Sequence, residues 1–309
     1  MTKIIVSKND EGQSLFKFIK KCFSTTSLSV IYKWFRTNKI KVNSKKINND
    51  SHKLLLKEGD VVMVFDYNNK EIRDKKINYD GNIPDIKIMY EDENILIIDK
   101  PENIEVHSPI NLSLDLMVKN YLKNTNQYNP LMENSFVVSH VHRLDKLTRG
   151  LIIYAKNAIS LTILNKIIND KDKIVKTYSA VVEGNIFKKQ IINGWIYYDE
   201  HSQKAIFDEK QDMHRKAKTA ILLLDPQMVR NNKTFISIAL NTGRKHQIRA
   251  TMDYLKHPIL NDFRYGAKKI NNEKMIFLFA TELNFIELPE PLNYLNGKKF
   301  RLDVNIDWN

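Results

Sequence analysis

The densest run of residue types that can do chemistry is HVHRLDKLTRG, residues 140–150. It stands between the apolar stretches 137–141 and 151–155, each of which predicts a strand, so its middle predicts a connecting loop. Asp145 lies in that loop among two arginines and a lysine, and neighbouring cations favour an ionised carboxylate. Loops often carry catalytic residues, but taken in isolation this aspartate is better explained as one that caps a turn.

The same run has a second interpretation as a metal site. His140 and His142 are two residues apart on a predicted strand, which places both side chains on one face, as zinc ligands can be. The sequence offers no nearby third ligand with metal-site spacing. We therefore predict no metal, with one of the two histidines in a structural hydrogen bond.

The charge of the chain points to an anionic partner. The 309 residues carry a formal net charge of +13, and residues 1–80 hold 17 Lys and Arg against 9 Asp and Glu. Such an excess favours nucleic acid or an anionic membrane surface, although a solvated lysine-rich surface explains it equally well. The hydrophobic fraction of 42% is that of a globular protein, and no apolar stretch approaches the roughly 20 residues that span a bilayer.

The N-terminus shows no signal peptide, and the single Cys22 excludes an internal disulfide. We accordingly expect a cytoplasmic protein with Cys22 in a core. The chain divides at the polar stretch 68–84, which contains Gly81 and Pro84 and predicts a linker between two domains, 1–67 and 85–309.

The first domain is predicted to contain two short helices within 14–36, followed by an alternating strand at 38–43 and another at 61–65. This order resembles the RNA-binding domain named after ribosomal protein S-four, which carries basic residues on its second helix and in the loop after it. The basic residues at those places, which would contact phosphates, are Lys33, Arg36, Lys39 and Lys41.

The second domain alternates strand-like and helical segments. Several strands follow one another without room for a crossover helix, which predicts an α+β domain with a mixed, largely antiparallel central sheet and flanking helices. The expected helices are 112–123, 158–169 and 246–256, and the expected strands are 86–90, 95–99, 137–141, 151–154, 178–182 and 235–240.

Four segments in order carry a family resemblance. They are ILIIDKP with a following VH (95–107), HRLDKLTRG (142–150), KTYSAVVEG (176–184) and LNTGRKHQIRATMDYLKHPILNDFRYG (240–266). Together they resemble the RluA family of large-subunit ribosomal RNA pseudouridine synthases, closest to its type-C enzyme, and the order and spacing cover the whole chain. The family converts uridine to pseudouridine without a cofactor, so the resemblance implies an isomerase with a pseudouridine synthase fold.

The resemblance also implies roles for individual residues. Asp145 would be the catalytic carboxylate, as nucleophile or general base, and Arg249 its ion-pair partner. Tyr178 would stack on the extruded uracil, and Arg143 would fill the space that the base leaves. Arg244 lies before a predicted helix start and fits either a phosphate contact or a surface arginine.

Three positions depart from the family pattern. Asn103 and Lys256 stand where glycine is expected, and Arg149 replaces a small Ser or Thr beside the catalytic loop. Asparagine tolerates left-handed backbone better than lysine does, so Lys256 is the larger departure. Arg149 is close enough in sequence to Asp145 to alter substrate approach.

The expected partner is large-subunit (23S) ribosomal RNA, and the resemblance implies a monomer on that RNA with no membrane association. The alternative from another class is a non-catalytic RNA-binding or ribosome-assembly protein that retains the fold. A metal-dependent hydrolase built on His140 and His142 is the third alternative.

Overall fold

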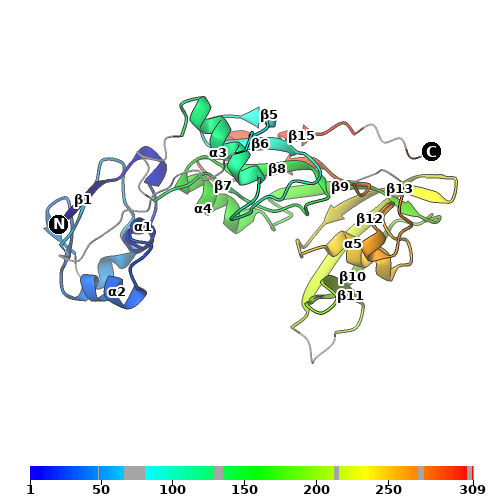
Figure 1. The fold of residues 1–309 in the computed structure, drawn as a ribbon, viewed down its shortest axis with the longest axis horizontal. Coiled ribbons are helices and arrows are strands. Elements are labelled where there is room, and N and C mark those ends of the chain that lie inside the picture. Colours follow the sequence, from blue (N-terminus) through cyan, green and yellow to red (C-terminus); the bar gives the residue numbers. More distant parts are fainter. Residues whose placement is uncertain are drawn as a thin grey trace.

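The chain folds into two parts (Figure 1), which together contain three hydrophobic cores. The computed structural model describes residues 1–47, 49–65, 81–128, 135–211, 216–270, 275–304 and 308. One core lies within residues 4–64, here called the N-terminal module, and the other two lie within the C-terminal domain that follows. The predicted linker lies mostly outside the described residues, so the domain boundary stays a prediction.

The N-terminal module packs two helices, α1 (Leu15–Cys22) and α2 (Leu28–Arg36), against a small antiparallel sheet. The buried residues of α1 follow helical spacing, and Cys22 is among them, as expected for a core cysteine. The sheet has the order β1 (Thr2–Ile5), β4 (Val61–Val64), β2 (Ile40–Val42) and β3 (Lys45–Lys46). The short helices η1 (Lys8–Asp10) and η2 (Asn49–Lys53) complete it.

The C-terminal domain is built on one 11-stranded sheet, which confirms the α+β prediction. Its named strand pairs are antiparallel except for β8 with β14. Along the sheet the strands are β11 (Lys204–Asp208), β10 (Gln190–Asp199), β12 (Lys218–Arg230), β13 (Lys233–Leu240), β9 (Ile174–Glu183), β14 (Leu278–Phe285), β8 (Arg149–Ala155), β6 (Ile95–Lys100) and β5 (Lys87–Glu91), with β15 (Lys299–Arg301) on β14 and β7 (Ser139–His140) on β8.

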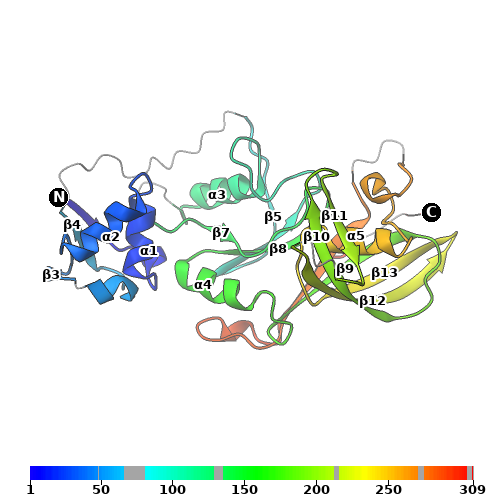
Figure 2. The same ribbon diagram turned by 90° about the horizontal axis from the view of Figure 1, so that it is seen from below.

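Helices cover both faces of this sheet. At one end, α3 (Leu114–Asn124) and α4 (Ala158–Ile167) pack against alternate residues of β6 and β8, so they lie on opposite faces (Figure 2). Every residue of β6 is therefore buried, which explains its continuous apolar run. At the other end, α5 (Gln247–Tyr254) packs on β11. No helix among the described residues is long and apolar enough to cross a membrane.

The strand predicted at 137–141 is reduced to the two residues of β7. Just before it, the backbone N–H groups of Ser135 and Phe136 donate to the Asp10 carboxylate instead of to a neighbouring strand. Strands β10, β11, β12, β14 and β15 were not predicted at all. Strand β10 contains Asn193 and Gly194, and β12 contains Pro226 at a register shift, and these residues obscure the alternating pattern.

The two positions where glycine was expected both have left-handed backbone. Asn103 and Lys256 each have a φ of 62°. Lys256 directly follows the last residues of α5, where helices commonly end on a glycine with positive φ. The substitution of lysine there retains the backbone geometry at a cost in conformational energy.

Lys256→Gly is accordingly expected to raise the free energy of unfolding by about 1 kcal/mol, because glycine adopts positive φ without steric penalty. The measurement is urea unfolding. Lys166 is the matched control, since it is an exposed lysine within α4 and its replacement by glycine should lower stability by about 1 kcal/mol. A destabilised Lys256→Gly variant would contradict the interpretation.

Candidate active site

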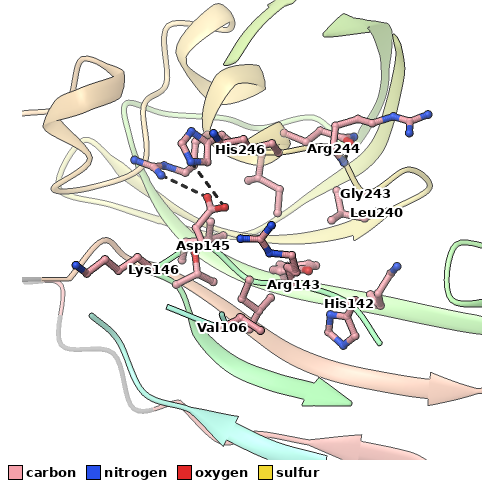
Figure 3. A pocket seen from close by; sticks show the side chains of 18 of the residues that line it. Val106, His142, Arg143, Asp145, Lys146, Leu240, Gly243, Arg244 and His246 are labelled. Atoms are coloured by element: carbon pink, nitrogen blue, oxygen red, sulfur yellow. Dashed lines mark hydrogen bonds and ion pairs between the residues drawn. The ribbon is translucent and has the colours of Figure 1, made fainter. Parts of the chain in front are cut away.

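A cavity of about 580 Å³ opens where the β7–β8 loop, strand β9 and the start of α5 meet (Figure 3). These three elements come from distant parts of the sequence. The sheet brings β8 and β9 close to each other, because only β14 separates them. The predicted residues that line the cavity are Arg143, Asp145, Tyr178, Arg244 and Arg249.

Asp145 and Arg249 form an ion pair within this cavity. Arg249 Nη1 donates to Asp145 Oδ2 at 3.3 Å. The Asp145 side chain is 22% exposed and that of Arg249 only 4%, so the carboxylate faces the cavity while the guanidinium lies behind it. Charge-assisted hydrogen bonds of this kind orient a carboxylate as well as stabilise its charge.

Arg249 is itself held by Asp262, a residue that the sequence did not single out. Arg249 Nε donates to Asp262 Oδ2 at 2.7 Å and Nη2 to Oδ1 at 2.9 Å, a bidentate pair in which Asp262 is almost fully buried. Burial on its own lowers the pKa of Arg249, but the Asp262 hydrogen bonds and the charges of Asp262 and Asp145 raise it above its usual value. The pair leaves Nη1 free to meet Asp145.

Tyr178 and Lys176 form one wall of the cavity. Both project from the same face of β9 and both are buried, as the alternation along this strand indicates. Burial raises the pKa of Tyr178 well above its usual value, so its hydroxyl stays protonated. Burial also lowers the pKa of Lys176 to about 8, and its Nζ donates to the Ile168 carbonyl at 2.6 Å.

His246 is a further residue that the sequence analysis did not select. Its Nε2 lies 3.8 Å from Asp145 Oδ1 and its Nδ1 2.8 Å from the Tyr265 hydroxyl. That hydroxyl accepts from the Ala205 N–H, which leaves its own hydrogen for Nδ1 and places Nε2–H toward Asp145. Burial lowers the pKa of His246, which keeps the imidazole neutral, and a φ of 54° holds it in this position.

A buried lysine holds the chain beside Asp145. Lys100, at the end of β6, is completely buried and donates to the carbonyls of Pro101, Ile104 and Lys146 at 2.6, 2.8 and 3.2 Å. Burial lowers the pKa of Lys100 to about 8, against the opposing influence of the Asp145 charge. The lysine thereby joins the turn after β6 to the loop that carries Asp145.

The two histidines considered as metal ligands have separate structural partners. His140 Nδ1 is 2.9 Å from Asp115, and His142 Nε2 accepts from the Ile153 N–H at 3.3 Å. Desolvation lowers the pKa of His142 to about 3, so its imidazole is neutral and can accept. Within the described ranges no cluster of three or more His, Cys, Asp or Glu side chains could hold a metal ion.

The remaining predicted residues lie at the edge of the cavity or far from it. Arg143 is exposed and reaches into the space beside Asp145, whereas Arg244 points away from it and its Nε donates to the Thr219 carbonyl (Figure 3). Helix α5 begins three residues after Arg244, so this arginine does not stand at the helix start. Lys33, Arg36 and Lys39 are exposed on the N-terminal module, and Lys41 is half-buried over the Phe65 ring.

Arg149 has a partner that the sequence analysis did not anticipate. Its Nε and Nη2 donate to the buried carboxylate of Asp99 at 3.2 and 2.8 Å. Arg149 is not one of the described residues that line the cavity. Its charge is therefore balanced by that of Asp99, and its influence on substrate approach stays a prediction.

The arrangement as a whole suits one kind of reaction. It offers Asp145, a carboxylate with a fixed cationic partner, together with an aromatic side chain and basic residues at the rim. A flat ring placed against Tyr178 would have Asp145 within reach, with cations to receive phosphates. This combination suits the binding of a nucleotide base beside a reactive carboxylate.

Comparisons with known proteins agree with this interpretation. The family model described as RNA pseudouridylate synthase matches residues 94–254, just over half of the chain. The chain belongs to the RNA pseudouridine synthase family, and it is an isomerase of the RluA type.

Among its relatives is an uncharacterized RNA pseudouridine synthase of Mycoplasma capricolum, 49% identical over all of this chain and 99% of that protein. The ribosomal large subunit pseudouridine synthase C of Buchnera aphidicola is 31% identical over 94% of this chain and 91% of its own length. The solved structure of human RNA pseudouridylate synthase domain containing 4 has the same fold, with a TM-score of 0.51 at 19% identity over 66% of this chain and 89% of that one.

Proposed function

We propose that this protein isomerises specific uridines of large-subunit (23S) ribosomal RNA to pseudouridine, with Asp145 as the catalytic carboxylate. The observation that carries the proposal is the Asp145–Arg249 ion pair, which lies in a cavity with Tyr178 on its wall. In this reaction the bond from ribose C1′ to N1 of uracil breaks, a bond from C1′ to C5 forms, and the C5 hydrogen is replaced by one on N1.

Each residue of the cavity has a place in this reaction. Asp145 acts on the uridine at the glycosidic bond, and Arg249 stabilises the charge of the carboxylate. Tyr178 stacks on the uracil and holds it while it turns, an interaction of about 1 to 3 kcal/mol per base. Arg143 enters the space that the flipped base leaves, and so offsets part of the few kcal/mol that base flipping costs.

The choice of ribosomal RNA rests on the relatives and on charge. The type-C relatives are named for the large ribosomal subunit, and the chain carries a net charge of +13. Phosphate contacts from Arg244 at the cavity and from Lys33, Arg36, Lys39 and Lys41 on the N-terminal module would position the RNA.

The direct experiment incubates the protein with transcribed 23S ribosomal RNA and maps pseudouridine by chemical labelling and reverse transcription. Transcribed 16S ribosomal RNA is the control. The proposal predicts a few discrete modified positions in the 23S RNA and none in the 16S RNA. Tight binding of 23S RNA without modification would favour a non-catalytic assembly protein, and modification of both RNAs would overturn the proposed substrate.

The lysine on the cavity wall predicts a pH dependence of binding. Because burial lowers the pKa of Lys176 to about 8, its positive charge is present at pH 7 and is lost as the pH rises through 8. We expect the KM for RNA to rise by roughly threefold to tenfold between pH 7 and pH 9, since one cationic contact is lost.

Lys176→Met isolates this effect. The variant should have the raised KM already at pH 7, with little further change up to pH 9. The measurement is KM for transcribed 23S RNA at constant ionic strength across that range. A variant that keeps the full pH dependence would assign the titration to another group.

A further inference from the structure

The N-terminal module is attached to the C-terminal domain through a buried carboxylate, Asp10, at the end of η1. Asp10 is completely buried, and its carboxylate accepts hydrogen bonds from several uncharged donors. Buried carboxylates are stable only when fully hydrogen-bonded, so the donors around Asp10 decide whether the attachment holds.

Three of those donors belong to the C-terminal domain. Asp10 Oδ1 accepts from the N–H of Phe136 and the hydroxyl of Ser135, both at 2.6 Å, and from the Ser135 N–H at 3.1 Å. These residues lie more than 120 positions away in the sequence. Two adjacent backbone N–H groups and a hydroxyl therefore form a preformed site for this one carboxylate.

The module contributes the remaining contacts. Ser7 Oγ donates to Asp10 Oδ2 at 2.8 Å, and Gln13 Nε2 donates to Asp10 Oδ1 at 3.2 Å and to Ser135 Oγ at 2.7 Å. Beside them Gly12 lies so close to α4 that a Cβ atom there would stand 2.7 Å from Ile159. The two parts fit together without a gap at this point.

The junction also reaches a basic surface of the module. Gln13 Oε1 accepts from Lys21 Nζ at 2.9 Å. Lys21 lines a cavity of about 660 Å³ together with Lys17, Lys20 and the hydroxyl side chains of residues 24–27. Lysines and hydroxyls around an open cavity suit the phosphates of an RNA backbone. This cavity is here called the lysine cavity.

The two RNA-facing surfaces lie apart. The module adjoins the end of the C-terminal domain that carries α3 and α4, whereas α5, whose first residues line the Asp145 cavity, lies nearer the other end (Figures 1 and 2). An RNA that contacts both must bridge this separation. If the distance between the two cavities is fixed, an RNA whose shape matches that distance binds more tightly. An RNA bound at one cavity is then held at a high effective concentration near the other.

We propose that Asp10 is a specificity-determining positioning residue, which locks the N-terminal module onto the C-terminal domain so that the enzyme selects RNAs able to contact the lysine cavity and the Asp145 cavity together. This inference rests on the proposed function. It predicts that the lysine cavity contacts an RNA segment at a fixed distance from the modified uridine.

Ser135→Asp tests the proposal from the side of the C-terminal domain, where the internal bonds of the module are untouched. The new carboxylate would stand next to Asp10, and two adjacent buried carboxylates repel each other. The double variant Asp10→Asn with Ser135→Asp restores a donor to the new carboxylate. Thr125→Asp adds the same charge at an exposed position after α3 and serves as the matched control.

Two RNAs distinguish the outcomes: transcribed 23S RNA, and a short hairpin cut around a uridine that the unmutated protein modifies. For Ser135→Asp we expect an about tenfold higher KM on 23S RNA with kcat kept, and less than about twofold change on the hairpin. Small-angle X-ray scattering should show a larger radius of gyration. Both changes should revert in the double variant and be absent in Thr125→Asp.

An unchanged KM on 23S RNA, with or without a change in the radius of gyration, would overturn the proposal. An equal rise in KM on 23S RNA and on the hairpin would also overturn the proposal, because it would indicate damage to the Asp145 cavity. If the unmutated protein modifies no uridine of 23S RNA, no such hairpin can be chosen and the proposed function itself fails. Failure of the proposed function can therefore be told apart from the results that overturn the proposal for Asp10.

Discussion

Asp145→Asn lowers the rate of pseudouridine formation on the order of 10⁴-fold or more, while the affinity for 23S RNA stays within about twofold. The amide keeps the shape of the carboxylate but cannot act as a nucleophile or base. Affinity is retained because binding depends on phosphate contacts and on stacking against Tyr178, which the substitution leaves in place. Single-turnover rates and filter binding measure the two quantities.

The fold of the Asp145→Asn variant should survive, because Arg249 keeps its bidentate partner Asp262. Asp208→Asn is the control, since Asp208 is exposed on β11 and is not a residue of the cavity lining given above. It should retain full activity. An Asp145→Asn variant with more than about 1% of the original rate would remove Asp145 from the chemistry.

Arg249→Met produces the second large effect, on stability and activity together. It leaves Asp262 buried without a partner, and breaking a buried ion pair from one side costs about 3 to 5 kcal/mol. It also removes the only hydrogen bond described here between Asp145 and a basic side chain. We therefore expect a much lower urea midpoint and a rate at least 100-fold below normal.

A double variant separates the two consequences. Arg249→Met with Asp262→Leu removes both charges of the buried pair, and an apolar replacement of such a pair is often neutral or stabilising. Stability should recover, whereas activity should not, because Asp145 still has no cationic partner. Recovery of activity with stability would show that Arg249 serves the fold alone.

The sequence predicted those parts of the fold that have regular burial. The run ILIID predicted β6 because both faces of that strand are covered, and the helix predicted at 246–256 contains α5, whose Ile248 and Met252 are buried. Strand β10 alternates buried and more exposed residues from Ile191 to Tyr197, but an exposed position holds Ile191 and a buried one holds Gly194, so burial does not follow residue type. No local pattern marked it.

The candidate site was only partly accessible from the sequence. Asp145, Tyr178 and Arg249 came from the family resemblance, and the structure brings them to one cavity. Asp262 lies within the fourth segment of the resemblance but was given no role: it is 13 residues from Arg249, and only the turn after α5 brings their side chains together. Asp10 likewise meets Ser135 only through the packing of the module, which no spacing in the sequence indicates.

The central claim is most directly tested by hydrogen release from C5 of uracil. Isomerisation replaces the C5 hydrogen by the bond to ribose, so 23S RNA transcribed with uridine tritiated at C5 should lose tritium to water at every turnover. We predict release by the unmutated protein in buffer containing a metal chelator and no added cofactor, and none by Asp145→Asn. RNA that binds tightly yet retains all its tritium would contradict the account.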